Sequence, residues 1–176
     1  MNSDEFLVWA RDRPGRWELH DGSPIAMSPE RVIHGDYKYR TARAFDAAIS
    51  AAKAPCRFVL DSAAVRIDER RTYQPDLMVY CGPAARPDAI EIANPVILVE
   101  ILSPSNALTD LRDKLAAYFT LPSVAHYLIV DPDKRLILHH ARATGGDIAT
   151  RIVSTGAIRL DPPGLEIAVA EIFSAT

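Results

Sequence analysis

One apolar stretch decides the fold of this chain: Val96-Ile97-Leu98-Val99-Glu100-Ile101-Leu102. It is rich in β-branched residues and is followed by Ser103-Pro104, a pattern typical of a strand covered on both faces at the centre of a sheet. One carboxylate, that of Glu100, interrupts it. Because burying an ionised carboxylate is costly unless the group is paired, Glu100 needs either a basic side chain or a metal ion as its partner. The metal alternative requires a second carboxylate nearby.

The length of 176 residues predicts a single domain over residues 1–176, with residues 1–15 as an N-terminal helical extension. A chain of this size buries roughly two-thirds of its unfolded surface around one core, so it needs no disulfide framework. Cys56 and Cys81 lie in apolar, strand-like contexts. We predict that both are reduced structural thiols.

The start of the chain lacks the positive region and long apolar core of a secretory signal, and no apolar run approaches the roughly 18 residues of a membrane span. We therefore expect a cytoplasmic protein without membrane association. The formal net charge of −3 argues against a general nucleic-acid coat, which would be basic. An enzyme that contacts DNA locally stays compatible with it, because an acidic metal site lowers the total charge while its metal attracts phosphate.

The first half of the chain carries clear turn and helix-start signals. Asp21-Gly22 favours the tight turn of a hairpin, and Ser28-Pro29-Glu30 has the N-cap serine and the proline of a helix start. The helix that follows should bury side chains at helical spacing, namely Ile33, Tyr37, Phe45, Ala48 and Ile49. We predict a helix over 4–11, a hairpin over 17–27, a helix from 28 to about 52, a strand pattern over 57–68 broken near 61–62, and a strand over 73–81.

The second half alternates between strand and helix patterns. We predict a loop over 82–94, the strand over 96–102, a helix over 109–121, a hairpin of strands 127–130 and 136–138, weak strands over 148–154 and 157–160, and a short helix over 169–173. The strand-helix-strand order around Glu100 implies a mixed sheet with helices packed on it. The fold class is therefore predicted to be α/β.

The second carboxylate that a metal would require is offered by Asp76, in Gln74-Pro75-Asp76-Leu77. Proline donates no hydrogen bond to a strand ladder, so Pro75 suits a strand start or a bulge, with Asp76 at the beginning of an apolar strand. If this strand pairs with the Glu100 strand, two carboxylates converge beside the Ile101 carbonyl. Mg²⁺ is usually held by such hard oxygens, together with waters and substrate phosphate.

The order of these motifs resembles a known superfamily. Pro75-Asp76, followed after 23 residues by Glu100-Ile101-Leu102, is similar to the pattern of the PD-(D/E)xK nucleases. More narrowly, four segments resemble the Uma-type family of proposed bacterial restriction endonucleases: Trp17-Glu18-Leu19-His20-Asp21-Gly22, Gln74-Pro75-Asp76-Leu77, Val99-Glu100-Ile101-Leu102-Ser103-Pro104-Ser105 and Tyr127-Leu128-Ile129-Val130-Asp131-Pro132. The likeness spans about residues 16–173. It implies a restriction-endonuclease-like core, a mixed β-sheet flanked by helices with additional antiparallel hairpins.

The chain departs from the superfamily pattern at Leu102, where the pattern has a lysine two residues after the glutamate. The resemblance implies that the lysine has moved to the next helix, where this chain has Lys114. A long side chain on a helix packed beside the strand can reach the strand end. Two other interpretations of Lys114 stay open, an ion pair with Asp110 one turn earlier and cover for apolar surface.

The resemblance implies catalytic roles for three residues. Asp76 and Glu100 would hold Mg²⁺ or Mn²⁺, which polarises the scissile phosphate and acidifies a bound water. Lys114 would orient that water or stabilise the developing charge.

Three further residues have weaker support. The resemblance includes Glu18, which would be an additional metal ligand, but an exposed strand carboxylate is an equal alternative. Gln74 would share a strand face with Asp76 and hold a metal-bound water, or simply make an edge hydrogen bond. His34 would approach phosphate, or be a partly exposed helical histidine.

The implied function is that of a metal-dependent endonuclease which hydrolyses DNA phosphodiester bonds, with DNA as its partner, no membrane, and a homodimer as a compatible assembly. The sequence contains no nucleophile elbow, Walker loop or CxxC motif, which excludes serine hydrolases, P-loop nucleotidases and thiol redox enzymes. Two alternatives stay open. Leu102 allows a catalytically weak nuclease-fold module that binds nucleic acid or a protein partner, and Glu100 could be only an ion-pair residue in a structural protein.

Overall fold

A six-stranded mixed sheet forms the centre of the structure, a computed structural model that describes residues 1–103 and 108–174, without the side chains of 108–110. The strand order is β10-β9-β8-β7-β6-β3. The strands are β3 (Cys56–Leu60), β6 (Leu77–Cys81), β7 (Pro95–Ile101), β8 (His126–Asp131), β9 (Leu136–Arg142) and β10 (Ile148–Val153). Strands β7 and β8 are parallel and the other neighbours are antiparallel. The mixed sheet predicted from the sequence is confirmed.

Two smaller antiparallel sheets complete the strand content. The four-stranded sheet has the order β2-β1-β5-β4, and the two-stranded one pairs β11 with β12. Their strands are β1 (Trp17–His20), β2 (Ser23–Ala26), β4 (Val65–Arg66), β5 (Thr72–Tyr73), β11 (Ala157–Leu160) and β12 (Leu165–Ala168). The predicted hairpin at Asp21-Gly22 is β1-β2, and both turn residues have positive φ. Strand β12 falls in a segment for which the sequence predicted no strand.

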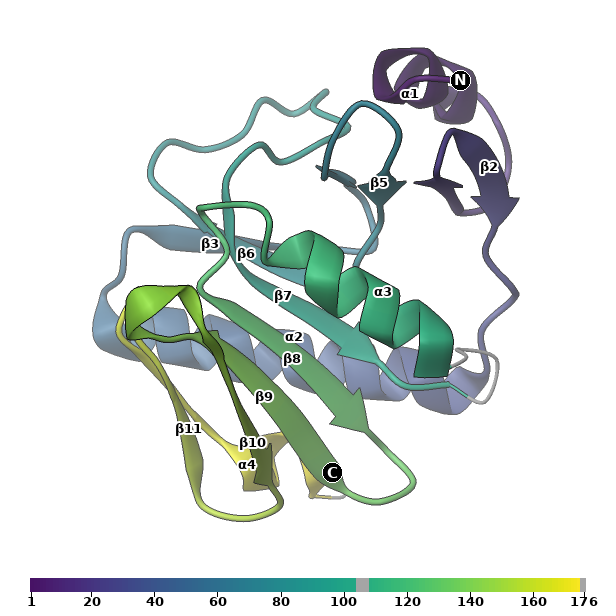
Figure 1. The fold of residues 1–176 in the computed structure, drawn as a ribbon. Helices are drawn as coiled ribbons and strands as arrows, with labels where there is room; N and C mark the ends of the chain where they lie inside the picture. Colours follow the sequence, from purple (N-terminus) through teal and green to yellow (C-terminus); the bar gives the residue numbers. More distant parts are fainter. Residues whose placement is uncertain (104–107, 175–176) are drawn as a thin grey trace.

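Helices cover both faces of the main sheet (Figure 1). Helix α2 (Val32–Ala52) lies behind the sheet and α3 (Leu108–Tyr118) lies in front of it. Short helices lie at the two ends of the chain, α1 (Ser3–Arg11) and α4 (Val169–Phe173), and a 3₁₀ turn, η1 (Thr144–Gly146), precedes β10. In the described residues, no helix has the length and apolar character of a membrane span.

Strand β7 divides the core between the two helix layers. Val99 belongs to the same buried cluster as Phe45 of α2, whereas Leu98 belongs to the cluster that contains Tyr118 of α3, as expected when successive side chains of a strand face opposite ways. Ile97, Leu98 and Val99 are each 0% exposed. The prediction that this stretch is a strand covered on both faces is confirmed.

The start of α2 differs from the prediction. The helix begins at Val32 with Arg31 as its N-cap and no side-chain capping bond, so the predicted start at Ser28-Pro29-Glu30 is wrong. Ile33 is 55% exposed and not buried. Glu30 is used instead in a tertiary contact, because both of its carboxylate oxygens accept hydrogen bonds of 2.6 Å from Lys38 Nζ.

The predicted strand over 73–81 is two strands in two different sheets. Tyr73 ends β5 in the four-stranded sheet, and Leu77 begins β6 in the main sheet. Pro75 lies between them, where it cannot donate to a ladder. Gln74 and Asp76 therefore do not share one strand face, and Asp76 lies where the chain passes from one sheet to the other.

The two cysteines form a disulfide, Cys56–Cys81, so the prediction of reduced thiols is wrong. Cys56 on β3 and Cys81 on β6 are directly opposite each other in the antiparallel register. The sequence alone does not give this register. Disulfides persist mainly in oxidising compartments. The Cys56–Cys81 pair therefore gives no support to the cytoplasmic location, which stays a prediction.

Candidate functional site

Asp76 and Glu100 lie on neighbouring strands at one end of the main sheet. Leu77 of β6 pairs with Val99 of β7, so Asp76 and Glu100 are the next residues outward on the two strands. Asp76 Oδ2 accepts a hydrogen bond of 2.7 Å from the backbone N–H of Ile101. Both carboxylates are buried, with 2% and 1% exposure. The predicted pairing of the two strands is confirmed.

Glu100 has a basic partner within the protein. Lys114 Nζ, on α3, donates a hydrogen bond of 3.0 Å to Glu100 Oε1, and the hydroxyl of Tyr118 donates one of 2.9 Å to the same oxygen. A lysine on the next helix thus reaches the strand end, as its length allows. The alternative pairing of Lys114 with Asp110 lies outside the part of the chain whose side chains are described.

Glu18 belongs to the same group of side chains. Its Oε1 accepts hydrogen bonds from Lys114 Nζ at 2.9 Å and from the backbone N–H of Gln74 at 3.0 Å, and its Oε2 lies 3.0 Å from His20 Nε2. Glu18 is 4% exposed, so the alternative of an exposed strand carboxylate is wrong. Burial opposes ionisation, but His20, Lys114 and the Gln74 N–H outweigh it and lower the pKa of Glu18. Lys114 therefore bridges two carboxylates from distant parts of the chain.

Asp76 contacts a second group of side chains, from α2 and the segment before β1. Its Oδ1 lies 2.9 Å from Lys38 Nζ and 3.3 Å from Arg16 Nη1, and its Oδ2 lies 3.3 Å from His34 Nε2. Although burial opposes ionisation, His34, Lys38 and the Ile101 N–H hold the pKa of Asp76 well below its usual range. His34 is 4% exposed, so the expectation of a partly exposed histidine is wrong.

Lys38 was missed as a site residue by the sequence reasoning, together with two of its carboxylate partners, Glu30 and Asp61. Its Nζ donates hydrogen bonds to Glu30 and, at 2.7 and 2.9 Å, to both carboxylate oxygens of Asp61. Spacing could have indicated part of this group, because Lys38 follows His34 by one helical turn on the same face. Asp61 gives no such signal, since its position depends on the pairing of β3 with β6.

Gln74 connects the two groups. Besides its N–H bond to Glu18, its side-chain amide donates a hydrogen bond of 2.8 Å to the Asp61 carbonyl, and its own carbonyl accepts one of 2.9 Å from Arg16 Nη2. These contacts favour the hydrogen-bonding alternative for Gln74.

We refer to the acidic and basic side chains of both groups as the carboxylate cluster: Glu18, Glu30, Asp61, Asp76, Glu100, Arg16, Lys38 and Lys114. With the histidines neutral, the cluster has five carboxylates and three cationic side chains. Among the described residues this leaves a formal excess of two negative charges, which one divalent cation would neutralise. Carboxylate oxygens are the ligands that Mg²⁺ prefers, so the donor set fits the implied metal.

The pKa of Glu100 is raised mainly by burial, and the excess negative charge contributes to the rise. Burial raises the pKa of Glu100 to about 7; Lys114 opposes the rise, and the negative charges of Asp76 and Glu18 add to it. A carboxyl that is partly protonated near neutral pH would lose its proton when a divalent ion binds.

We expect the raised pKa of Glu100 to make the protein less stable as the pH rises. The pKa increases from 4.5 in the unfolded chain to about 7, so unfolding releases a proton between these values and stability falls through this range. Glu100→Gln does not titrate and should lack this decrease, which we expect to be on the order of 2 kcal/mol. The lowered pKa values of Asp76 and Glu18 act only at lower pH.

The measurement is urea unfolding of both proteins in metal-free buffer from about pH 5 to about pH 8. Parallel pH profiles for wild type and Glu100→Gln would contradict the prediction.

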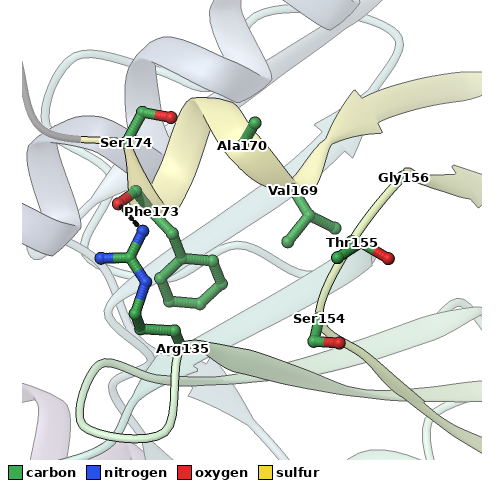
Figure 2. A pocket seen from close by; sticks show the side chains of 8 residues that line it. All are labelled: Arg135, Ser154, Thr155, Gly156, Val169, Ala170, Phe173 and Ser174. Carbon is green, nitrogen blue, oxygen red and sulfur yellow. Dashed lines mark hydrogen bonds between the residues drawn. The ribbon is translucent and has the colours of Figure 1, made fainter.

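A hollow at the C-terminal helix shares no lining residue with the carboxylate cluster (Figure 2). Its lining residues are Arg135, Ser154, Thr155, Gly156, Val169, Ala170, Phe173 and Ser174. The Arg135 guanidinium donates a hydrogen bond of 2.6 Å to the Phe173 carbonyl. Because the described lining has no carboxylate or imidazole, this hollow does not offer metal ligands.

Comparison with known proteins is consistent with this arrangement. The family model for Uma2, described as "Putative restriction endonuclease", matches residues 3–170. An uncharacterized protein of Synechocystis sp., slr1290, is 25% identical over 175 residues, which cover 98% of this chain and 91% of that protein. A crystal structure titled as a "putative nuclease belonging to DUF820", from Anabaena variabilis, matches with a TM-score of 0.77 and 16% identity, over 99% of this chain and 98% of that chain. The structural match shows a shared fold.

Proposed function

The chain belongs to the Uma2 family of restriction-endonuclease-like proteins, and from this membership and the carboxylate cluster we propose that it is a Mg²⁺-dependent endonuclease that hydrolyses DNA phosphodiester bonds. The observation that carries the proposal is the pairing of β6 with β7, which brings Asp76 and Glu100 to one sheet end with Lys114 at 3.0 Å from Glu100. Mn²⁺ is an alternative cofactor with the same oxygen ligands.

Asp76 and Glu100 are the proposed metal ligands, with Glu18 as a further one. When bound there, the ion would supply Lewis-acid polarisation of the phosphate and lower the pKa of a water molecule. The Ile101 N–H fixes one oxygen of Asp76 against the backbone of β7, next to Glu100. The sheet backbone thus positions the Asp76 carboxylate, whereas Lys114 and Tyr118 of α3 position that of Glu100.

Lys114 contributes positive charge to the site. It is buried, with 2% exposure, and the carboxylates of Glu18 and Glu100 fix its position at 2.9 and 3.0 Å. An ammonium held in a site with little water stabilises the charge that develops on a phosphate in the transition state more strongly than one in solution. Lys114 thereby takes the role of the lysine that is absent at Leu102.

The test is cleavage of supercoiled plasmid DNA by the purified chain. We expect nicked or linear products with added Mg²⁺ or Mn²⁺, and no cleavage after chelation by EDTA, because the carboxylates alone do not polarise the phosphate. Cleavage that persists in EDTA would contradict the metal requirement. DNA binding without cleavage in either metal would instead support the alternative of a weakly active binding module, which the loss of the lysine at Leu102 favours.

A further inference from the structure

Two side chains beside the proposed magnesium ligand Asp76 are arranged to bind a metal ion together with it. Glu30, His34 and Asp76 each offer one ligand atom, and these atoms all lie within 4.8 Å of one another. His34 Nε2 is 3.3 Å from Asp76 Oδ2 and 3.7 Å from Glu30 Oε1. Ligands that share one ion with bonds of about 2.1 Å are separated by about 3 to 4 Å, so these distances suit a common ion.

His34 gives an independent indication of a ligand. The residue is 4% exposed, and neither of its ring nitrogens has a hydrogen-bond partner within the described part of the chain. Buried polar atoms are rarely left in this state, and an unpaired imidazole nitrogen facing two carboxylates is a favourable metal ligand. The contact with Asp76 at 3.3 Å lacks hydrogen-bond geometry.

We propose that Glu30, His34 and Asp76 form a second cation site, which binds transition-metal ions such as Zn²⁺ or Mn²⁺ in preference to Mg²⁺. The preference follows from the imidazole ligand, because Mg²⁺ favours oxygen ligands alone whereas Zn²⁺ and Mn²⁺ accept nitrogen and oxygen together. The site shares Asp76 with the proposed magnesium site. Its other two ligands are His34, in α2, and Glu30, which lies two residues before that helix. Binding here does not depend on whether the chain cleaves DNA.

The Lys38 ammonium competes with a metal ion for this site, because it contacts two of the three ligands. Its Nζ is 2.6 Å from Glu30 Oε1 and 2.9 Å from Asp76 Oδ1. A bound ion would have to displace the ammonium from Glu30 and Asp76, and with it the Arg16 guanidinium, which contacts the same Glu30 oxygen at 2.5 Å. Lys38 would keep Asp61, at 2.7 Å, as its partner. Glu30 has a side-chain exposure of 30%, so an ion can approach from solvent on this side. The competition predicts that removing the Lys38 charge strengthens metal binding.

The test is calorimetric titration of the full chain with Zn²⁺, Mn²⁺ or Mg²⁺ alone. We expect His34→Gln to weaken Zn²⁺ and Mn²⁺ binding at least about tenfold and to change Mg²⁺ binding less than about threefold. Glu100→Gln should instead weaken Mg²⁺ binding at least about tenfold and change Zn²⁺ binding less than about threefold, because it removes a proposed magnesium ligand and keeps Glu30, His34 and Asp76. Lys38→Met should strengthen Zn²⁺ binding.

Pulsed EPR of bound Mn²⁺ should show imidazole nitrogen coupling that His34→Gln removes.

Equal Zn²⁺ affinity of wild type and His34→Gln, or no nitrogen coupling in wild type, would overturn the proposal. Circular dichroism checks that each variant is folded. If His34→Gln does not fold, Glu30→Gln replaces it, because Glu30 lies outside the helix and is partly exposed. If the wild-type chain binds Zn²⁺ but neither binds Mg²⁺ nor cleaves DNA, only the nuclease proposal is contradicted. If it cleaves DNA but does not bind Zn²⁺, only the second cation site is contradicted.

Discussion

Replacing Asp76 with asparagine should lower the rate of metal-dependent DNA cleavage at least about a thousandfold, an increase of about 4 kcal/mol in the activation barrier. Asparagine keeps the size of the side chain and an oxygen that can accept the Ile101 N–H bond of 2.7 Å. It removes the negative charge, and with it a carboxylate ligand for a divalent ion. Asp76→Asn therefore tests the charge with little change in packing.

Asp131→Asn is the matched control for this variant. Asp131 is also a buried aspartate of the main sheet, at the end of β8, and its carboxylate accepts a backbone N–H bond from Lys134. Among the described residues, its side chain makes no hydrogen bond or ion pair with the carboxylate cluster, so we expect the cleavage rate of Asp131→Asn to stay within about threefold of wild type. Plasmid nicking with Mg²⁺ is measured for both variants, with thermal unfolding as a check of folding. A wild-type rate in Asp76→Asn would refute the proposed role.

The sequence predicted the parts of the fold that depend on local patterns. The apolar run around Glu100 indicated a central strand, and Asp21-Gly22 indicated a hairpin turn, because both signals lie within a few residues. The reach of Lys114 to Glu100 was implied by the resemblance to the Uma-type family and not by a local pattern. It is possible because the helix after β7 packs back onto the sheet beside that strand.

The sequence could not predict contacts set by strand register or by the exact end of an element. The Cys56–Cys81 disulfide requires β3 and β6 to pair with these residues opposite each other. Glu18 was left between a ligand and an exposed residue, because alternation in a four-residue strand does not show that α3 covers it. Lys38 stayed unnoticed because the helix was predicted to begin at Ser28, which placed Glu30 inside the helix and away from Lys38.

We expect Lys114→Met to destabilise the protein by about 3 to 5 kcal/mol, the usual effect of leaving buried charges without their partner. The substitution removes the only cation that contacts both Glu18 and Glu100 among the described residues, and these two carboxylates are 4% and 1% exposed. Methionine fills a similar volume, so the loss reflects charge more than packing. Urea unfolding at neutral pH measures the effect, and cleavage should fall about a hundredfold or more.

The structural and catalytic parts of this effect can be separated by adding Glu18→Gln to Lys114→Met. Glu18, Glu100 and Lys114 together have a formal charge of −1 in the wild type and −2 in Lys114→Met, and the double variant returns this charge to −1. The remaining carboxyl, Glu100, has a pKa of about 7 and can take up a proton. We expect it to recover roughly half of the lost stability while cleavage stays low, because no ammonium is left to stabilise the charge on the phosphate. Glu18→Gln alone is the reference for any effect of losing a metal ligand. If the double variant regained both stability and cleavage, Lys114 would serve only to neutralise two buried carboxylates, and the charge on the phosphate would have to be stabilised by another group of the cluster.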